Sequence, residues 1–209
     1  MYTIPMRAVN RHTGQETRYN LNSPLLFGVL QALDPETRVD ILDLAPANAN
    51  MLDYFAQSHC KLHLPACRDE LLTLRLTEDE VEPPLSRVFE TCLPLPDSDN
   101  NPLDLLLLWD LPNYLDKQVL SALITYLAPY TGKRTVLHTY IHTRQSMPAQ
   151  PGDYRLTLEK NVLVDMPAAW TATSPMYYQE LLHKILAPFR VERGMLLANG
   201  LQEYILRTK

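Results

Sequence analysis

The sequence predicts an α/β fold in which helices cover both faces of a doubly wound, mostly parallel sheet. Short apolar runs alternate along the chain with stretches whose apolar residues recur at helical spacing. The run Leu103–Trp109 is almost continuously apolar, which is typical of a strand buried on both faces of a parallel sheet. Two strand-like segments, 189–194 and 201–207, close the chain and indicate an antiparallel hairpin.

Composition indicates a single soluble domain. The chain has 209 residues, of which 46% are hydrophobic and 21% charged, enough to bury a sizeable core. We expect residues 1–22 to form an N-terminal arm or cap and residues 23–209 to form one domain. The net charge of −5 argues against a sequence-independent nucleic-acid surface. The apolar runs are too short to span a membrane. Three cysteines without paired spacing, and no signal peptide, indicate a cytoplasmic protein.

The amino-terminal half begins its regular structure at Ser23-Pro24, a helix cap followed by a first-turn proline. The expected elements, in order, are a helix over 25–33, a strand over 39–44, a helix over 48–58, a strand over 61–64 and a short helix or irregular crossover over 68–76. The following stretch, 77–102, contains acidic and proline-bearing turns and little apolar pattern, so we expect loops and one short segment near 88–93.

The carboxy-terminal half repeats the alternation of strand and helix. The expected elements are a strand over 103–109, a helix over 115–127, a strand over 135–141, short strand pieces within 155–164, a helix capped by Ser174-Pro175, and the closing strand pair. Residues 146–152 contain two prolines and a glycine, and we expect them to form a loop over the top of the sheet.

The segment Arg38–Asn50 predicts a site. An apolar run ends at Asp43, and the small residues Ala45, Ala47 and Ala49 follow before a helical pattern begins. Turns of this kind bind ligands because strand ends and helix N-termini point free backbone N–H groups into one crevice. Small side chains leave that crevice open, although alanine resists positive φ angles that glycine accepts.

With this order of elements, the chain resembles the class I S-adenosylmethionine-dependent methyltransferases from about Ser23 to Arg207. The segment 41–49 is similar to that family's first motif, an aspartate followed by a glycine-rich turn. The segment 103–115 is similar to its fourth strand and following loop, and 129–134 to the turn before its fifth strand. The resemblance implies a seven-stranded sheet that ends in a reversed hairpin, and S-adenosylmethionine as the cofactor.

The chain departs from the family pattern in two places. The glycine positions of the first motif are occupied by Ala45, Ala47 and Ala49, which crowd the amino-acid end of the cofactor. The acidic residue that binds the ribose hydroxyls in the family has no counterpart in His63–Cys67. A charge-assisted hydrogen-bond pair of that kind contributes ~1.5–3 kcal/mol. We therefore expect cofactor binding to be weakened, remodelled or lost.

The resemblance and the residue pattern of the strands together suggest candidate site residues. Those expected to hold the cofactor are Asp43, Ala45, Ala47, Ala49, Asn113 and Tyr114. Those expected to face a methyl acceptor, as contact or base, are Asp110, Tyr140 and His142. Simpler interpretations remain open: Asp43, Asp110 and Asn113 would cap the helices that follow them, and the row His138, Tyr140, His142 on one strand face would be partly buried and hydrogen-bonded.

No metal site is expected. The ligand types at His59, Cys60, His63 and Cys67 match no common zinc spacing. Trp109 is expected in the core rather than as a stacking platform for a ligand.

Two functions remain open. The first is an enzyme that transfers a methyl group from S-adenosylmethionine to a small molecule or a protein side chain. The second is a catalytically inactive methyltransferase-like protein that binds or regulates a partner. The Asp43 and Asp110–Asn113–Tyr114 positions favour the first, and the three alanines and the missing carboxylate favour the second. The acceptor, the partner and the oligomeric state are not determined by the sequence.

Overall fold

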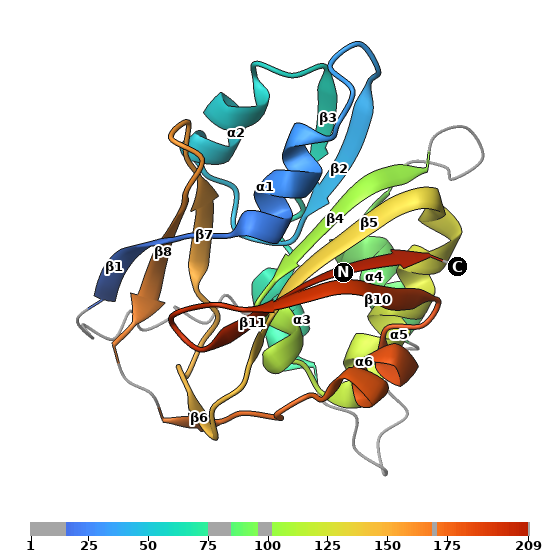
Figure 1. Cartoon of the computed structure of the whole chain (residues 1–209). Coiled ribbons are helices and arrows are strands. Elements are labelled where there is room, and N and C mark those ends of the chain that lie inside the picture. The colour runs from blue at the N-terminus through green and yellow to red at the C-terminus, as the bar shows by residue number, and fades with distance from the viewer. Residues whose placement is uncertain (1–15, 75–84, 96–101, 169–170, 209) are drawn as a thin grey trace, which may run out of the picture.

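The computed structural model describes residues 16–74, 85–95, 102–168 and 171–208. Its main sheet has six strands in the order β10-β11-β5-β4-β2-β3 (Figure 1). These strands are β2 (Val39–Asp43), β3 (Cys60–His63), β4 (Leu103–Trp109), β5 (Thr131–His142), β10 (Phe189–Leu196) and β11 (Leu201–Thr208). Strands β3, β2, β4 and β5 run parallel, and β11 and β10 form an antiparallel hairpin beside β5. The mostly parallel α/β fold with its closing hairpin is confirmed.

The strand count differs from the seven strands that the resemblance implied. In the described part of the chain, β3 forms the edge of the sheet, and helices α3 (Arg68–Thr73) and α4 (Leu85–Cys92) occupy the connection to β4. The expected count of seven is therefore wrong for the described residues, which contribute six.

Helices cover both faces of the sheet. Helices α1 (Pro24–Gln31) and α2 (Ala49–Phe55) pack on one face, and α4, α5 (Lys117–Leu127) and α6 (Gln179–Ile185) pack on the other (Figure 1). Strand β4 shows why: Leu105 and Leu107 belong to the core under α1, whereas Leu106 and Leu108 belong to the core under α5. A central parallel strand buried on both faces requires this continuous apolar run.

A second, three-stranded antiparallel sheet lies over the carboxyl ends of β2 and β4. It consists of β1 (Glu16–Leu21), β8 (Val162–Pro167) and β7 (Asp153–Leu156), in that order. Its inner side chains, including Tyr154, Leu156 and Val164, join the same core cluster as α1 and α2. Strand β1 pairs with β8 along its whole length. It falls within residues 1–22, which were expected to form an arm or cap and of which 1–15 lie outside the described residues.

Smaller elements complete the chain. A two-stranded pair joins β6 (Ser146–Met147), at the start of the segment expected as a loop, to β9 (Ala172–Thr173). A single 3-10 turn, η1 (Leu111–Asn113), follows β4, and another, η2 (Ala128–Tyr130), precedes β5. The expected cap of the last helix was wrong: α6 begins after Tyr178, and the Ser174 hydroxyl instead donates to the carbonyl of His142. Within the described residues, no helix has the length and apolar character needed to cross a membrane.

Candidate functional site

The carboxyl ends of β2, β4 and β5 bring most of the predicted site residues into one region. Asp43 ends β2 and is fully buried. Its Oδ1 accepts two hydrogen bonds, one from the backbone N–H of Ala45 at 2.9 Å and one from the indole Nε1–H of Trp109 at 2.6 Å. Its Oδ2 is buried and has no hydrogen-bond partner within the described residues. Burial raises the pKa of Asp43 to about 7.

Trp109 packs beside Asp43. Its side chain is 2% exposed, and its ring stacks on Tyr154 with centroids 5.0 Å apart and planes at 8°. Tyr154 comes from β7, so the small sheet supplies one side of this stack and β4 the other. The backbone of Trp109 has φ of 51°, a left-handed conformation that is strained for a bulky residue. The expectation that Trp109 belongs to the core is confirmed.

The alanine turn is built without left-handed residues. Ala45 is buried, Ala47 and Ala49 are exposed, and none of the three has a positive φ. Helix α2 is capped by Asn48, whose side-chain oxygen accepts from the N–H of Met51 at 3.0 Å. The first N–H groups that a ligand would use are thus taken in part by Asp43 and Asn48. Alanine is compatible with this turn because its backbone never needs the freedom of glycine.

Asp110 lies behind the turn that follows β4. It is 1% exposed, and its Oδ2 accepts from the N–H of Gly152 at 3.2 Å. Its Oδ1 is buried without a hydrogen-bond partner in the part of the chain that the structure describes. Burial raises the pKa of Asp110 to about 7. A carboxyl group with this pKa can hold or release a proton near neutrality.

Asn113 and Tyr114 differ in how far their polar groups are used by contacts within the chain. The Asn113 amide donates to the carbonyls of Asp110 at 2.7 Å and Tyr140 at 2.9 Å, and its oxygen accepts from the N–H of His142 at 2.9 Å. The hydrogen bonds of the Asn113 side chain therefore fix the turn after β4 to β5. Tyr114 is partly buried, and its ring meets the ring of His142 edge-on, with centroids 6.3 Å apart.

The row of His138, Tyr140 and His142 shares one face of β5, as expected, and all three are at most 3% exposed. The Tyr140 hydroxyl donates to Ser23 Oγ at 2.7 Å, and Ser23 in turn donates to Glu203 Oε1 at 2.5 Å. The Tyr140 hydroxyl is therefore occupied by an internal hydrogen-bond network. This makes Tyr140 a weaker candidate for contact with a ligand than Asp110 or His142.

Glu203 is the centre of that network and was missed by the sequence reasoning. It is fully buried on β11 and accepts from the N–H groups of Leu25 and Leu26, at 3.2 Å and 2.8 Å. Its Oε1 also lies 3.2 Å from His138 Nε2. Burial raises the pKa of Glu203, but the bonds from His138, Ser23 and Leu26 outweigh burial and lower it. Its alternation with Leu201 and Ile205 was the available signal, because that spacing places it on the buried strand face.

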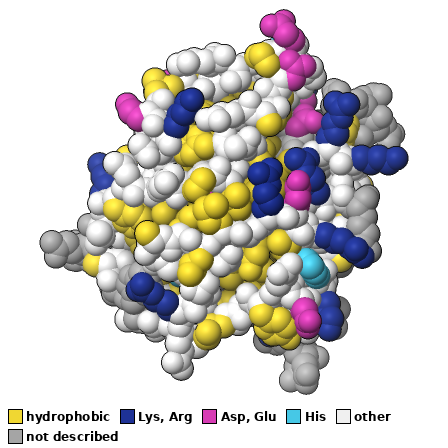
Figure 2. All heavy atoms as spheres, viewed as in Figure 1, with side chains coloured by type: hydrophobic (Ala, Val, Ile, Leu, Met, Phe, Trp, Pro, Cys, Tyr) yellow, Lys and Arg dark blue, Asp and Glu magenta, His cyan; other side chains and the backbone are white. Residues whose placement is uncertain are grey.

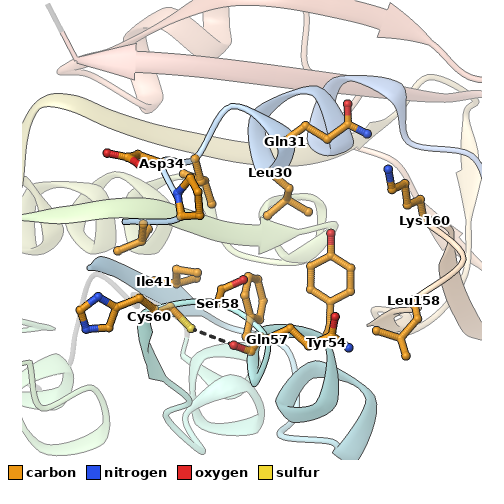
Figure 3. A pocket seen from close by; sticks show the side chains of 15 residues that line it. Leu30, Gln31, Asp34, Ile41, Tyr54, Gln57, Ser58, Cys60, Leu158 and Lys160 are labelled. Atoms are coloured by element: carbon orange, nitrogen blue, oxygen red, sulfur yellow. Dashed lines mark hydrogen bonds between the residues drawn. The ribbon is translucent and has the colours of Figure 1, made fainter. Parts of the chain in front are cut away.

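His142 is a predicted site residue that lines a cavity. Its Nε2 lies 4.0 Å from Asp110 Oδ2, and burial lowers its pKa to about 4. It lines a cavity of about 230 Å³ together with Tyr19, Met166 and Leu201, and neither Asp110 nor Tyr140 is among the lining residues. A larger cavity, of about 440 Å³, lies at the amino ends of β2 and β3, with Tyr54 on its wall (Figure 3). None of the predicted site residues is among those that line it.

Two remaining expectations concern ligands at β3 and metals. His63 ends β3, and its Nε2 lies 3.3 Å from Asp40 Oδ1; β3 itself contains no acidic residue. Among the described residues, no group of three His, Cys, Asp or Glu side chains is placed to hold a metal ion.

Comparison with known proteins gave matches to solved structures alone: no family model matches the chain, and no curated protein matches its sequence. Its structural neighbours include methyltransferases. The 1,6-didemethyltoxoflavin N1-methyltransferase of Burkholderia thailandensis, solved with S-adenosylhomocysteine, matches over 90% of this chain and 76% of its own, with 11% identity and a TM-score of 0.46. The glycopeptide N-methyltransferase MtfA, also solved with S-adenosylhomocysteine, covers 90% of each chain with 9% identity and a TM-score of 0.47.

A third neighbour is an S-adenosylmethionine-dependent methyltransferase of Clostridium acetobutylicum, which matches over 88% of this chain and 89% of its own, with 14% identity and a TM-score of 0.46. The chain is similar in outline to these methyltransferases. The fold is assigned from the strand order of the sheet and not from these distant matches. Statements about the site rest on the side chains of this chain.

Proposed function

We propose that this chain is a catalytically inactive, methyltransferase-like protein that acts by binding or regulating a partner. One observation carries the proposal: the Asp43 carboxylate, which would order the cofactor loop, is hydrogen-bonded to Trp109, and Trp109 is stacked on Tyr154. The crevice at the ends of β2 and β4 is thus filled by the chain's own aromatic rings. S-adenosylmethionine bound there would have to displace the indole and remove one of the two hydrogen-bond donors of Asp43 Oδ1.

Two further features support the same function. The alanine turn adds methyl groups where the resembled family has glycines, and β3 offers no carboxylate for a ribose. The three cysteines of the chain are free thiols, which fits the cytoplasmic location expected from the sequence.

A second candidate function, methyl transfer to a small molecule or a protein side chain, is favoured by Asp110 and His142. These side chains lie 4.0 Å apart, and His142 lines the cavity of about 230 Å³ beside them. Burial raises the pKa of Asp110 to about 7, which suits a general base near neutrality. In that case the aromatic stack would open to admit S-adenosylmethionine.

Calorimetric titration of the purified chain with S-adenosylmethionine and S-adenosylhomocysteine distinguishes the two functions. The inactive protein should give no heat and no thermal shift at millimolar ligand. Micromolar binding that is lost in Asp43→Ala would contradict the proposal and establish a working cofactor site. The double variant Ala45→Gly, Ala47→Gly should bind no better than the parent chain, because the indole of Trp109, and not the alanine methyl groups alone, fills the crevice.

A further inference from the structure

A groove of about 260 Å³ lies at the amino-terminal end of the parallel strands, opposite the crevice of Asp43. Four arginines line it: Arg38 before β2, Arg134 in β5, Arg193 in β10 and Arg207 in β11. These positions are far apart in the sequence, and the sheet brings them together. In a chain whose net charge is −5, this is a local concentration of guanidinium groups.

Two of the four arginines form ion pairs with acidic residues in the described part of the chain. Arg38 lies 3.2 Å from Asp40, and Arg207 pairs with Glu192. Within the described residues, no carboxylate forms an ion pair with Arg134 or Arg193, and both side chains are exposed. Their guanidinium groups therefore present donors that match a carboxylate in a two-pronged geometry.

The two acidic residues in the groove are engaged with neutral donors. Asp34 accepts from the hydroxyl of Thr37 at 2.7 Å and from the N–H of Glu36 at 3.0 Å. Asp104 accepts from the N–H of Asp40 at 2.9 Å. The lining holds four arginines and these two aspartates, and Asp40 and Glu192 balance Arg38 and Arg207. The donors that remain for an incoming carboxylate are therefore those of Arg134 and Arg193, and the groove as a whole has no excess of positive charge.

The wall formed by α1 is low and apolar. Val29 and Val136 are buried beneath the groove, and Gly28 and Ala32 are exposed along the helix. A Cβ atom at Gly28 would meet nothing within 4 Å, so packing inside this chain does not require glycine there. Figure 2 shows Lys and Arg side chains gathered over β5 and beside α1, next to hydrophobic surface. The open space at Gly28 leaves room for another chain to approach the helix.

We propose that this groove binds an acidic segment of a partner protein, with carboxylates on Arg134 and Arg193 and an apolar side chain against α1 at Gly28. Recognition of acidic segments by arginine clusters is a recurring mode of peptide binding. The mixture of guanidinium groups and apolar wall favours a peptide over a simple anion, which would use the charge alone. The inference depends on the proposed function in one respect, namely that the partner is a protein.

Fluorescence anisotropy with a short fluorescein-labelled peptide of alternating glutamate and leucine tests the proposal. The parent chain should bind it saturably, and Arg193→Glu should weaken binding by about tenfold or more, as expected for loss of a charge-assisted contact. Gly28→Leu should weaken it comparably while keeping every arginine, because the new side chain fills the groove. The matched control, Arg87→Glu on α4, makes the same charge change on the opposite face of the sheet and should bind as the parent does.

Several results would overturn the proposal. An equal loss in Arg87→Glu would mean attraction to net charge rather than to the groove, and full binding by Gly28→Leu would exclude contact with α1. Competition by tripolyphosphate or single-stranded RNA at lower concentration than the peptide would indicate a phosphate site instead. Thermal unfolding of each variant shows whether it is folded. Because S-adenosylmethionine titration is measured separately, cofactor binding would overturn the proposed function without altering the result for the groove.

Discussion

The indole of Trp109 donates a 2.6 Å hydrogen bond to the carboxylate of Asp43, joining the ends of two neighbouring parallel strands. The two residues are 66 positions apart in the chain, and both are buried. The bond is one of two that the buried Asp43 Oδ1 accepts, the other coming from the Ala45 N–H. It also holds the indole ring next to the turn that follows β2. Stability of the fold and closure of the crevice therefore depend on the same contact.

The first prediction concerns this contact. Trp109→Phe should lower the free energy of unfolding by ~1–3 kcal/mol, because it removes one of the two hydrogen bonds to the buried Asp43 Oδ1 and leaves only the bond from the Ala45 N–H. Urea denaturation monitored by circular dichroism measures the change. A double-mutant cycle with Asp43→Asn supplies the control, since the two effects should be non-additive if the bond is responsible. Strict additivity would show that ring volume alone accounts for the loss.

The second prediction concerns pH. Asp43 and Asp110 have folded pKa values of about 7, raised by burial from 3.8, so the native state binds more protons than the unfolded chain between these values. Their contribution to stability is present below pH 4 and is lost as pH rises through 7. His142 acts oppositely: its pKa is lowered to about 4 by burial, so its neutral form contributes stability that is lost as pH falls from 6.5 towards 4.

Urea midpoints measured from pH 4.5 to 7.5 show how stability changes with pH and test which of these residues causes each change. Asp110→Asn removes one carboxyl group and should make the fall in stability towards pH 7 shallower. His142→Gln should make it steeper over pH 4 to 6.5, because it removes the group that opposes the fall. Identical pH profiles for Asp110→Asn and the parent chain would mean that Asp110 is ionised in the native state across this range.

The third prediction concerns Glu203. Glu203→Ala should lower the free energy of unfolding by ~3–5 kcal/mol, because it removes the buried acceptor of Ser23 and of the first N–H groups of α1. Chemical denaturation measures the change. The neighbouring Gln202→Ala, on the other face of β11, serves as the control and should cost less than ~1 kcal/mol. Equal effects of the two changes would contradict the role of Glu203 as the cap of α1.

The fourth prediction compares two glycines. Gly28→Ala should raise the free energy of unfolding by ~0.5–1 kcal/mol, because alanine is the better helix former and its Cβ meets nothing within 4 Å. Gly200→Ala should lower it, because Gly200 has φ of +87° and a Cβ there would lie 2.9 Å from Arg144 Nε. Thermal unfolding of both variants measures the difference in sign. A destabilising Gly28→Ala would show that the helix face is packed rather than open.

Residue patterns along the chain were sufficient to predict most elements. Leu103–Trp109 was expected as a strand buried on both faces, and it forms the centre of the sheet. Asn48 was expected near the start of a helix and caps α2. These predictions succeed because a strand or helix leaves its period in neighbouring residues. The predicted number of strands was wrong because the seventh strand was expected from the family resemblance alone. No apolar pattern within residues 64–102 indicated it.

The sequence by itself determined the periodic elements, the closing hairpin and the position of Asp43 at a strand end. Only the tertiary structure decided what those side chains do. It pairs Asp43 with Trp109, stacks Trp109 on Tyr154 from a strand that the pattern barely indicated, and buries Glu203 under α1. The physical reason is that periodicity records which face of an element is buried, whereas a hydrogen-bond partner is set by packing between segments that the sequence separates.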